Sequence, residues 1–218
     1  MQEIKKYFRD ICVKRIFLWQ LLFVSGFCYV AYFLCGQVLF SRESLTELLK
    51  LMCLAPLLYF FSGRFVLRNP GDEGALKWNI AYCAVFFLSL HWYYLQFIKS
   101  VNYSLTLSDL RNLPPVAAVV FVSGAFFIAL LAFYHFRLAR KRKILAGYLI
   151  TFWGGIVLIA FYAYLRGRLD AIHIHHYFLA AYILLFLRFR TPVTMICSAF
   201  CAGVCVEGIA EWGMDPLF

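Results

Sequence analysis

Histidine and carboxylate side chains gather near the C-terminus, in two apolar stretches of the chain. The first stretch begins with Asp170, His173, His175 and His176. The second ends with Glu207 and Glu211. Residues three or four positions apart lie on the same face of a helix. Asp170, His173 and His176 are therefore predicted to form one stripe, and the two glutamates to form another.

Imidazole and carboxylate groups in one place suit Zn²⁺ or another divalent first-row metal. We predict that His173, His176 and Glu207 are the metal ligands. A metal in such a site lowers the pKa of its bound water to about 7, and Glu211 would act as the catalytic base toward that water. Additional candidates for the site are Asp170, His175, His91 and Asp215.

The same side chains also fit roles that need no metal. Because histidine titrates near neutral pH, they could relay protons. A His–Glu pair could instead join two helices through a hydrogen bond. Polar side chains at helix ends also contact lipid headgroups and water. The sequence leaves these alternatives open.

Two helices must position these residues. The stretch 171–187 enters the apolar region from its histidine-rich end, and 192–212 leaves it at its glutamate-rich end, with a short connection between them. Helices joined by a short loop are antiparallel neighbours. The histidines and the glutamates are therefore predicted to lie at the same end of the helix pair.

The composition indicates a membrane protein. Of the 218 residues, 64% are hydrophobic and only 15% are charged, whereas soluble domains contain about 45–50% apolar and about 25% charged residues. A membrane helix needs about 20 mainly apolar residues. The candidate stretches are 16–40, 45–61, 78–98, 114–136, 144–165, 171–187 and 192–212.

We therefore predict an all-α, polytopic transmembrane bundle with about seven spans. A basic cytoplasmic segment, 1–15, precedes a single membrane domain, 16–212, and a short outer-side tail, 213–218, follows it. Most Lys and Arg residues of the loops fall on one side of this arrangement. Because cytoplasmic loops are enriched in Lys and Arg, the N-terminus is predicted to be cytoplasmic and the C-terminus to face the lumen or exterior.

Three further features bear on location and partners. The triplet Asn102-Tyr103-Ser104 would be an outer-side glycosylation sequon. A eukaryotic endomembrane or plasma membrane fits the charge pattern, and a mitochondrial inner membrane would give the same asymmetry. The net charge of +10 follows from the loop bias, so we expect no nucleic acid partner. The expected partners are the lipid bilayer, other membrane subunits, and anionic lipid at the basic run Arg140, Lys141, Arg142 and Lys143.

The C-terminal part of the chain resembles one family. It has a His-x-His-His-Tyr start at His173 and a Gly-Ile-x-x-Trp-Gly-x-Asp-Pro close at Gly208. These motifs resemble the tail of a family of eukaryotic polytopic membrane proteins that has no assigned activity. The resemblance covers about the last 50 residues. It implies a membrane location and supplies no function.

Three functions are compatible with these observations. The first is a metal-dependent membrane hydrolase with its His/carboxylate site in the outer leaflet, acting on a lipid or amide bond. The second is a non-catalytic structural subunit of a larger membrane complex. The third is a small proton-coupled transporter that uses the same residues. Whether the chain is an enzyme depends on which of the three is correct.

Overall fold

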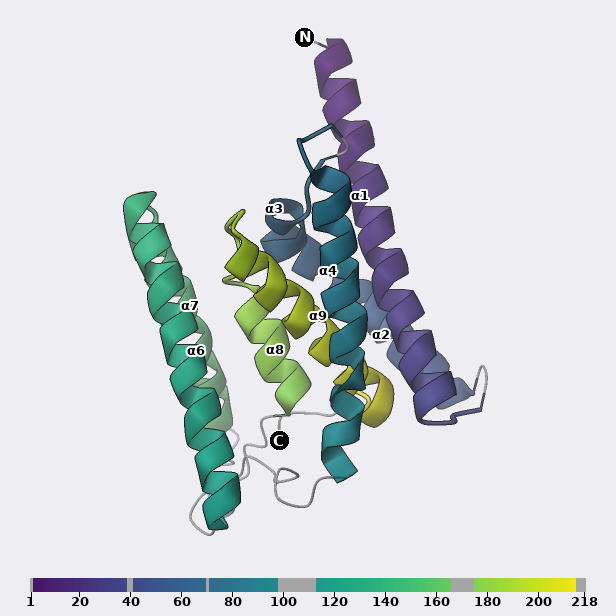
Figure 1. Ribbon diagram of the computed structural model, residues 1–218, viewed down its shortest axis with the longest axis vertical. Helices are drawn as coiled ribbons and strands as arrows, with labels where there is room; N and C mark the ends of the chain where they lie inside the picture. The colour runs from purple at the N-terminus through teal and green to yellow at the C-terminus, as the bar shows by residue number, and fades with distance from the viewer. Residues whose placement is uncertain (1, 39–40, 70, 98–112, 166–174, 215–218) are drawn as a thin grey trace. The chain divides into compact units, whose positions relative to one another are not determined.

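The computed structural model describes residues 2–38, 41–69, 71–97, 113–165 and 175–214. All of the regular secondary structure in these ranges is helical, as predicted (Figure 1). The elements are α1 (Gln2–Cys28), η1 (Tyr29–Leu34), α2 (Arg42–Leu58), η2 (Tyr59–Gly63), α3 (Arg64–Val66), α4 (Ala75–Ser89), η3 (Leu90–Phe97), α6 (Pro115–Lys141), α7 (Leu145–Leu165), α8 (His176–Leu184) and α9 (Pro192–Trp212). Here η1 and η2 are π-helical stretches, and η3 is a 3₁₀-helix.

Five helices among the described residues are long and apolar enough to cross a membrane. They span Val13–Leu34, Arg42–Val66, Pro115–Lys141, Leu145–Tyr162 and Pro192–Trp212. The chain is therefore a membrane-embedded, multi-pass helical protein whose apolar helices contact lipid. The predicted stretches 78–98 and 171–187 correspond to shorter α-helices, since α4 has 15 residues and continues as a 3₁₀-helix, and α8 has 9.

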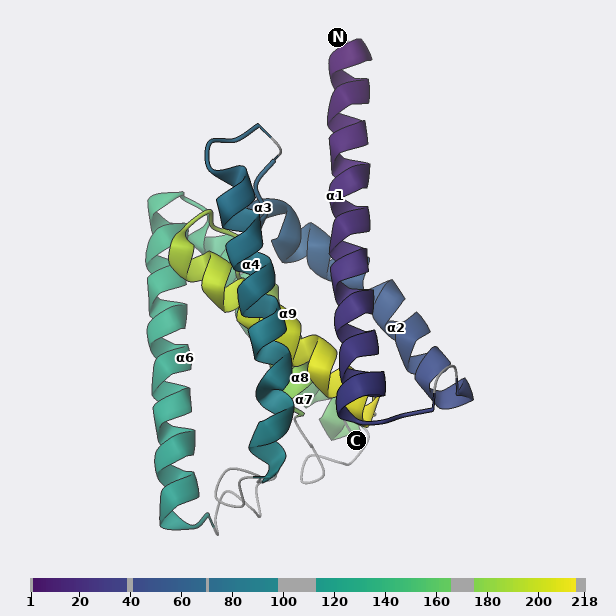
Figure 2. The same cartoon turned by 45° about the vertical axis from the view of Figure 1, so that its right-hand side comes forward.

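Local sequence explains where several of these helices begin. The Ser41 hydroxyl accepts a hydrogen bond from the backbone N–H of Ser44, which caps α2. Thr191 caps α9 in the same way, through the N–H of Thr194, and Pro192 follows at the first helical position. By contrast, α1 is continuous across the predicted boundary at residue 15. Figure 2 shows its first turns extending beyond the neighbouring helices α2 and α4.

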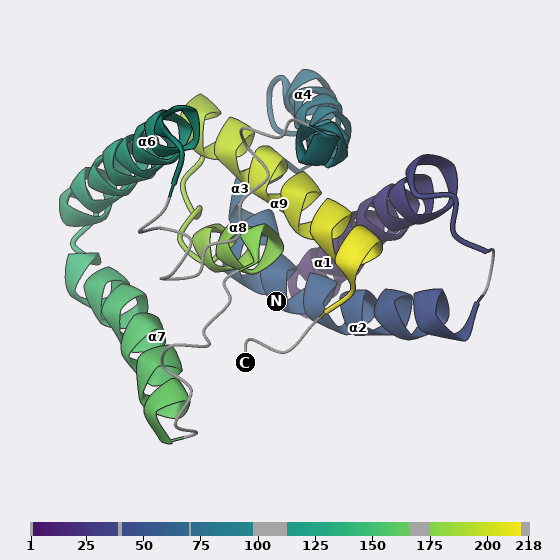
Figure 3. The ribbon, with the colours of Figure 1, turned by 90° about the horizontal axis from the view of Figure 1, so that it is seen from below.

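The chain divides into two compact units. Unit 1 comprises Met1–Tyr93 and His176–Asp215, and unit 2 comprises Tyr94–His175 and Pro216–Phe218. In unit 2, α6 and α7 form a hairpin (Figure 3). Its turn places Lys143 at a positive φ of 57°. The predicted lipid-binding run from Arg140 to Lys143 lies at this turn, where α6 ends.

Helix α9 forms the centre of unit 1. It contacts α8, α4, α1 and α2, and Figure 3 shows these helices around it. Every residue from Cys201 to Ala210 is buried. Aromatic side chains of α1 and α4 fill the space beside it, with the Trp19 and Phe23 ring centroids 4.9 Å apart and the Phe23 and Phe86 centroids 5.9 Å apart. The second half of α9, the most C-terminal apolar helix, therefore lies in the core of unit 1.

Close approach of α4 to α9 depends on Gly203. A Cβ at this position would overlap the Ser89 hydroxyl and lie 2.6 Å from the backbone oxygen of Phe86. The backbone of α4 cannot move aside as a flexible side chain would. The small residue therefore sets how closely the two helices pack, in agreement with the role of small residues between membrane helices.

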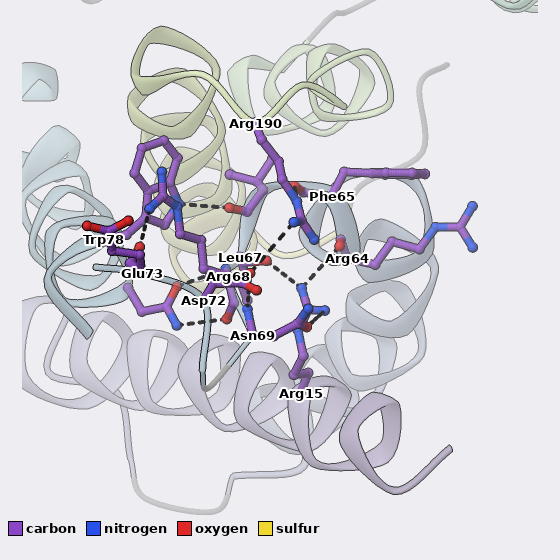
Figure 4. A network of polar contacts seen from close by, with 12 residues as sticks. Arg15, Arg64, Phe65, Leu67, Arg68, Asn69, Asp72, Glu73, Trp78 and Arg190 are labelled. Atoms are coloured by element: carbon purple, nitrogen blue, oxygen red, sulfur yellow. Dashed lines mark hydrogen bonds and ion pairs between the residues drawn. The ribbon is translucent and has the colours of Figure 1, made fainter. Parts of the chain in front are cut away.

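The two ends of α9 differ in charge. We call the Pro192 end the basic end and the Trp212 end the acidic end. At the basic end, the Arg15 guanidinium donates to Asn69 Oδ1 at 2.7 Å and to the Leu67 carbonyl at 2.6 Å (Figure 4). The Nε of Arg190 donates to the Phe65 carbonyl at 3.3 Å. These bonds join the start of the α1 span, the end of α3 and the connection before α9 at one level.

Candidate functional site

The acidic end of α9 contains a buried carboxylate paired with an imidazole. The Glu207 Oε2 atom lies 3.0 Å from His176 Nε2. The Glu207 side chain is 1% exposed, whereas the His176 side chain is 35% exposed. The predicted convergence of the antiparallel helices α8 and α9 is thus confirmed for these two residues. Burying a carboxylate is costly unless a partner compensates it, and His176 supplies that partner.

The position of His176 follows from the start of α8, which begins at this residue. Its ring projects from the first turn of α8 toward α9. Because Nε2 faces Glu207, the other ring nitrogen, Nδ1, is left to face a ligand or a proton acceptor. A carboxylate that holds one nitrogen of a histidine fixes both the orientation of the ring and its tautomer. The pair therefore has a supporting member, Glu207, and a member with reactive capacity, His176.

Gly208 makes room for this pair. A Cβ at Gly208 would lie 2.9 Å from His176 Nε2 and 2.7 Å from the Cβ of Tyr177. Any larger residue would therefore push α8 away from α9 at the level of the carboxylate. The sequence analysis placed Gly208 only in the C-terminal motif and missed its function. A glycine next to a candidate ligand on a helix, Glu207 here, is the signal that could have identified it.

Other polar groups surround the acidic end. The Gln37 amide donates to the Ala210 carbonyl at 2.9 Å. Glu47 Oε2 accepts a hydrogen bond of 2.7 Å from the backbone N–H of Met214, and its Oε1 pairs with Lys50 at 2.6 Å. Glu47 therefore caps the exit from α9. Gln37, which follows the first apolar helix, and Glu47, which lies near the start of the second, are therefore both at the acidic end.

Cys35 lies close to both glutamates of α9. Burial and the nearby carboxylates of Glu211 and Glu207 together raise the pKa of its thiol to about 11, and burial is the largest of these causes. Glu211 itself is partly buried, one helical turn beyond Glu207. Spacing along the chain does not relate residue 35 to residue 207, so only the tertiary structure brings Cys35 near these glutamates.

The other predicted site residues have different outcomes. His173, Asp170 and Asp215 lie outside the described residues, as does the sequon at Asn102. His175 is the residue before α8 and is partly buried. Their roles stay predictions.

His91 is engaged elsewhere in unit 1. Its Nε2 atom lies 3.2 Å from the Tyr29 hydroxyl, and its Nδ1 atom lies 3.1 Å from the Phe87 carbonyl oxygen. Both ring nitrogens therefore have polar partners within the bundle. This arrangement ties η1 to η3, and it makes His91 a useful control for experiments on His176.

No group of three or more His, Cys, Asp or Glu side chains suited to a metal occurs among the residues that the structure describes. His176 and Glu207 are bonded to each other through Nε2 and Oε2. With its carboxylate on Nε2, Glu207 would orient the His176 ring while Nδ1 of the same ring binds a metal. A metal would then need ligands from the segment before α8, which contains His173.

A separate group of buried hydroxyls lies nearer the basic end. The Ser62 hydroxyl donates to the Leu187 carbonyl at 2.8 Å and lies 3.0 Å from the Ser198 hydroxyl. The Tyr82 hydroxyl is 3.4 Å from Ser198. The group joins η2, α4 and α9 and satisfies its polar atoms by mutual bonding, as buried polar groups in membrane helices must.

Comparison with known proteins adds no family: no family model, curated protein or solved structure matches the chain. The resemblance of the C-terminal motifs therefore stays a prediction. The class that the fold defines is a multi-pass helical membrane protein, and its candidate site is the buried His176–Glu207 pair.

Proposed function

We propose that this protein is a metal-dependent membrane hydrolase whose reactive group is His176, held in position by Glu207. One observation carries the proposal: a carboxylate that is 1% exposed lies 3.0 Å from the Nε2 atom of a histidine that is 35% exposed. A fully buried acid beside a partly exposed imidazole is the arrangement in which the acid orients the ring and the ring does chemistry.

The proposal changes the role of Glu207. The sequence predicted Glu207 as a ligand, and its contact with His176 Nε2 supports the proposal that it orients the imidazole instead. His176 would bind the metal through Nδ1, and His173, three residues earlier in the chain, would be the second histidine ligand. The metal would supply a water of lowered pKa. Glu211, one turn beyond Glu207 and near Cys35, remains the candidate base toward that water.

The substrate class follows from the location. The pair lies at one end of an apolar helix, where lipid ester or amide bonds meet water. A substrate with a hydrophobic tail could approach the exposed side of His176 while Glu207 stays shielded. We therefore infer a lipid-like ester or amide as the substrate class.

Metal content of the purified protein tests the proposal. The protein is purified in detergent without chelators, equilibrated with Zn²⁺, dialysed and measured by elemental mass spectrometry. Wild type should retain about one metal per chain, and His176→Ala and His173→Ala should each lose it. Glu207→Gln should bind about 10–100-fold more weakly, as for other orienting residues. The matched control is His91→Ala, which should bind like wild type.

Two results would overturn the proposal. One is a wild-type protein that retains no stoichiometric metal. The other is metal binding that His91→Ala weakens as much as His176→Ala does, because the metal would then be bound nonspecifically by histidines.

A non-catalytic subunit of a membrane complex is the second candidate. In the most apolar parts of α6 and α7 only 6% of the residues are buried, whereas 83% are buried in the corresponding part of α9. Helices with such exposed apolar surfaces need lipid or further subunits around them. A defined complex of larger mass in mild detergent, without bound metal, would favour this candidate over the hydrolase. The proton-coupled transporter remains a third prediction.

We also infer the predicted seven-span topology, with the basic end of α9 in the cytoplasm. The N-terminal segment and two connections, which the topology places on one side, supply the bonds of Arg15 with Leu67 and Asn69 and the pairing of Arg190 with Asp72. Groups that it places on the other side meet at the acidic end, as in the contacts of Gln37 and Glu47 with the end of α9. The arginines assign the basic end to the cytoplasm. Cysteine labelling from either side of sealed vesicles would test this orientation.

A further inference from the structure

We propose that the arginines at the basic end of α9 bind the phosphate of an anionic phospholipid headgroup. The arginine cluster consists of Arg15, Arg64, Arg68 and Arg190 (Figure 4). The proposal concerns the opposite end of unit 1 from the His176–Glu207 pair and does not depend on the proposed hydrolase activity.

The cluster lies at the depth of lipid headgroups. The apolar span of α1 begins at Val13, two residues before Arg15. The second apolar span ends at Val66, directly after Arg64 and Phe65, and the last one begins at Pro192, two residues after Arg190. Side chains at the ends of apolar spans are level with the polar interface of a bilayer. Phosphate groups of lipids are therefore the anions at highest local concentration.

Cations exceed acids at this level among the described side chains. The cations are Lys14, Arg15, Arg64, Arg68, Lys77, Arg188 and Arg190. The acids are Asp72 and Glu73. Asp72 Oδ2 accepts from the Asn69 N–H at 3.0 Å and lies 3.6 Å from the Arg190 Nη1 atom. Seven cationic side chains therefore face two acidic ones among the described residues at this level.

Two of the arginines are held firmly by the protein. Arg15 donates to Asn69 Oδ1, to the Leu67 carbonyl at 2.6 Å and to the Arg64 carbonyl at 3.0 Å. Arg68 donates to the Glu73 carbonyl at 2.6 Å, and its guanidinium lies 4.2 Å from the centre of the Trp78 ring. These two side chains fix the backbone segment from which Arg64 projects.

The guanidinium groups of Arg64 and Arg190 have N–H donors that are not used in the hydrogen bonds of the described residues. Figure 4 shows the Arg64 side chain pointing away from Arg15 and Asn69. Its guanidinium lies 4.5 Å from the centre of the Phe65 ring, and it makes no hydrogen bond within the described ranges. Arg190 is 49% exposed and makes one long hydrogen bond, 3.3 Å to the Phe65 carbonyl, besides its loose pairing with Asp72.

A phosphate is the anion that fits these donors. A guanidinium carries five N–H groups in a planar fork that matches phosphate oxygens. The Phe65 ring restrains the Arg64 fork, so less conformational freedom is lost on binding. Phe65 lies one residue before the end of an apolar span at Val66, so the acyl chains of a phospholipid bound there would lie beside α3. A membrane lipid therefore satisfies both the polar and the apolar part of this surface.

Lipid selectivity measured by electron paramagnetic resonance tests the proposal. The full chain is reconstituted in phosphatidylcholine vesicles that contain spin-labelled phosphatidylserine or spin-labelled phosphatidylcholine. Wild type should restrict the serine lipid at least threefold more strongly than the choline lipid. Arg64→Gln and the double variant Arg64→Gln/Arg190→Gln should lower this ratio toward one. Arg64→Lys, which keeps the charge and loses the fork, should give an intermediate ratio.

The matched control removes the same charge from the same end. Lys14→Gln/Lys77→Gln should keep most of the selectivity, because neither lysine belongs to the cluster. An equal loss in this control would overturn the proposal in favour of diffuse surface charge. Absence of selectivity in wild type would also overturn it. Displacement of the serine lipid by 10 mM inorganic phosphate, but not by chloride of equal ionic strength, would show that free phosphate is the ligand and would overturn the lipid assignment.

Arg64→Gln alone keeps the experiment decisive if the double variant misfolds. The Arg64 side chain is exposed and contacts the protein through the Phe65 ring, so its loss should leave the fold intact. An unchanged lipid ratio in this folded variant would contradict the proposal.

Discussion

The two ends of α9 solve the problem of charge in a membrane protein in different ways. At the basic end, arginines donate to backbone carbonyls of α3 and of the residues after it, and most of their charge stays at the surface. At the acidic end, one carboxylate is almost completely buried and is bonded to one imidazole. At the basic end, charged side chains thus satisfy backbone carbonyls, whereas at the acidic end a carboxyl group is buried beside an imidazole.

The side chains at the two ends also differ in the chemistry that they can perform. Arginine stays protonated at physiological pH and serves well for capping, anchoring and anion binding. An imidazole can gain and lose a proton or bind a metal near neutral pH. The proposed positioning of His176 by Glu207 would account for the cost of burying this carboxylate.

Gly203→Ala should have the largest effect, since Gly203 lies between the two ends and holds α4 against α9. The added Cβ would overlap Ser89 Oγ and approach the Phe86 backbone oxygen. We expect a loss of at least about 3 kcal/mol in the free energy of unfolding, at the upper end for overpacked cores. Thermal unfolding in detergent measures it. Gly124→Ala is the control, because a Cβ there meets nothing within 4 Å; equal stability of the two variants would contradict the packing described for α4 and α9.

Gly208→Ala should damage the acidic end while leaving the basic end intact. The new Cβ would lie 2.9 Å from His176 Nε2, so α8 must shift away from α9. We expect a loss of about 1–3 kcal/mol in stability and a reduction of at least tenfold in metal affinity if the proposed site is correct. Titration with Zn²⁺ and thermal unfolding separate the two effects. A variant that is destabilised but binds metal like wild type would show that Gly208 serves packing alone.

Arg15→Gln should damage the basic end while leaving the acidic end intact. Arg15 donates to one side-chain oxygen and two carbonyls across α1 and α3. Hydrogen bonds from charged groups contribute about 1.5–3 kcal/mol, and partial exposure places the expected loss in unfolding free energy near the lower limit. Lys14→Gln, the exposed neighbour, should change stability little. Similar unfolding temperatures for Arg15→Gln and wild type would show that these hydrogen bonds add no net stability, because water satisfies the same oxygens in the variant.

The smallest expected effect concerns Cys35 and the charge on Glu211. Negative charge on Glu211 raises the pKa of the thiol, so Glu211→Gln should lower that pKa and increase the thiolate fraction at pH 8. In a variant that keeps Cys35 as its single cysteine, alkylation by a maleimide should become about two- to threefold faster, because the thiolate is the nucleophile. Glu43→Gln, on the exposed first turn of α2, should leave the rate unchanged. A rate that does not respond to Glu211→Gln would place this carboxylate farther from Cys35.

Several features followed from sequence alone because they depend on local or additive properties. The membrane class follows from an apolar content that water cannot accommodate. The bounds of the last helix, 192–212, follow from Pro192 at its start and from the mainly apolar stretch after it, and they match the structure. The convergence of His176 with Glu207 followed from a short loop and antiparallel packing. The predicted count of seven spans is not confirmed, because five helices among the described residues are long and apolar enough to cross a membrane. The α-helices α4 and α8 are shorter.

Other features depended on contacts between residues far apart in the chain, so only the tertiary structure could decide them. The Glu207 carboxylate meets Nε2 of His176, an atomic detail that spacing does not encode. Gly203 and Gly208 gained their roles from the backbones and side chains that α4 and α8 bring against α9. At the basic end residue 15 meets residue 69 and residue 190 meets residue 72, although no pattern links them. Composition and periodicity determine how the chain meets the bilayer, whereas the packing of one helix on another determines which polar atoms face each other.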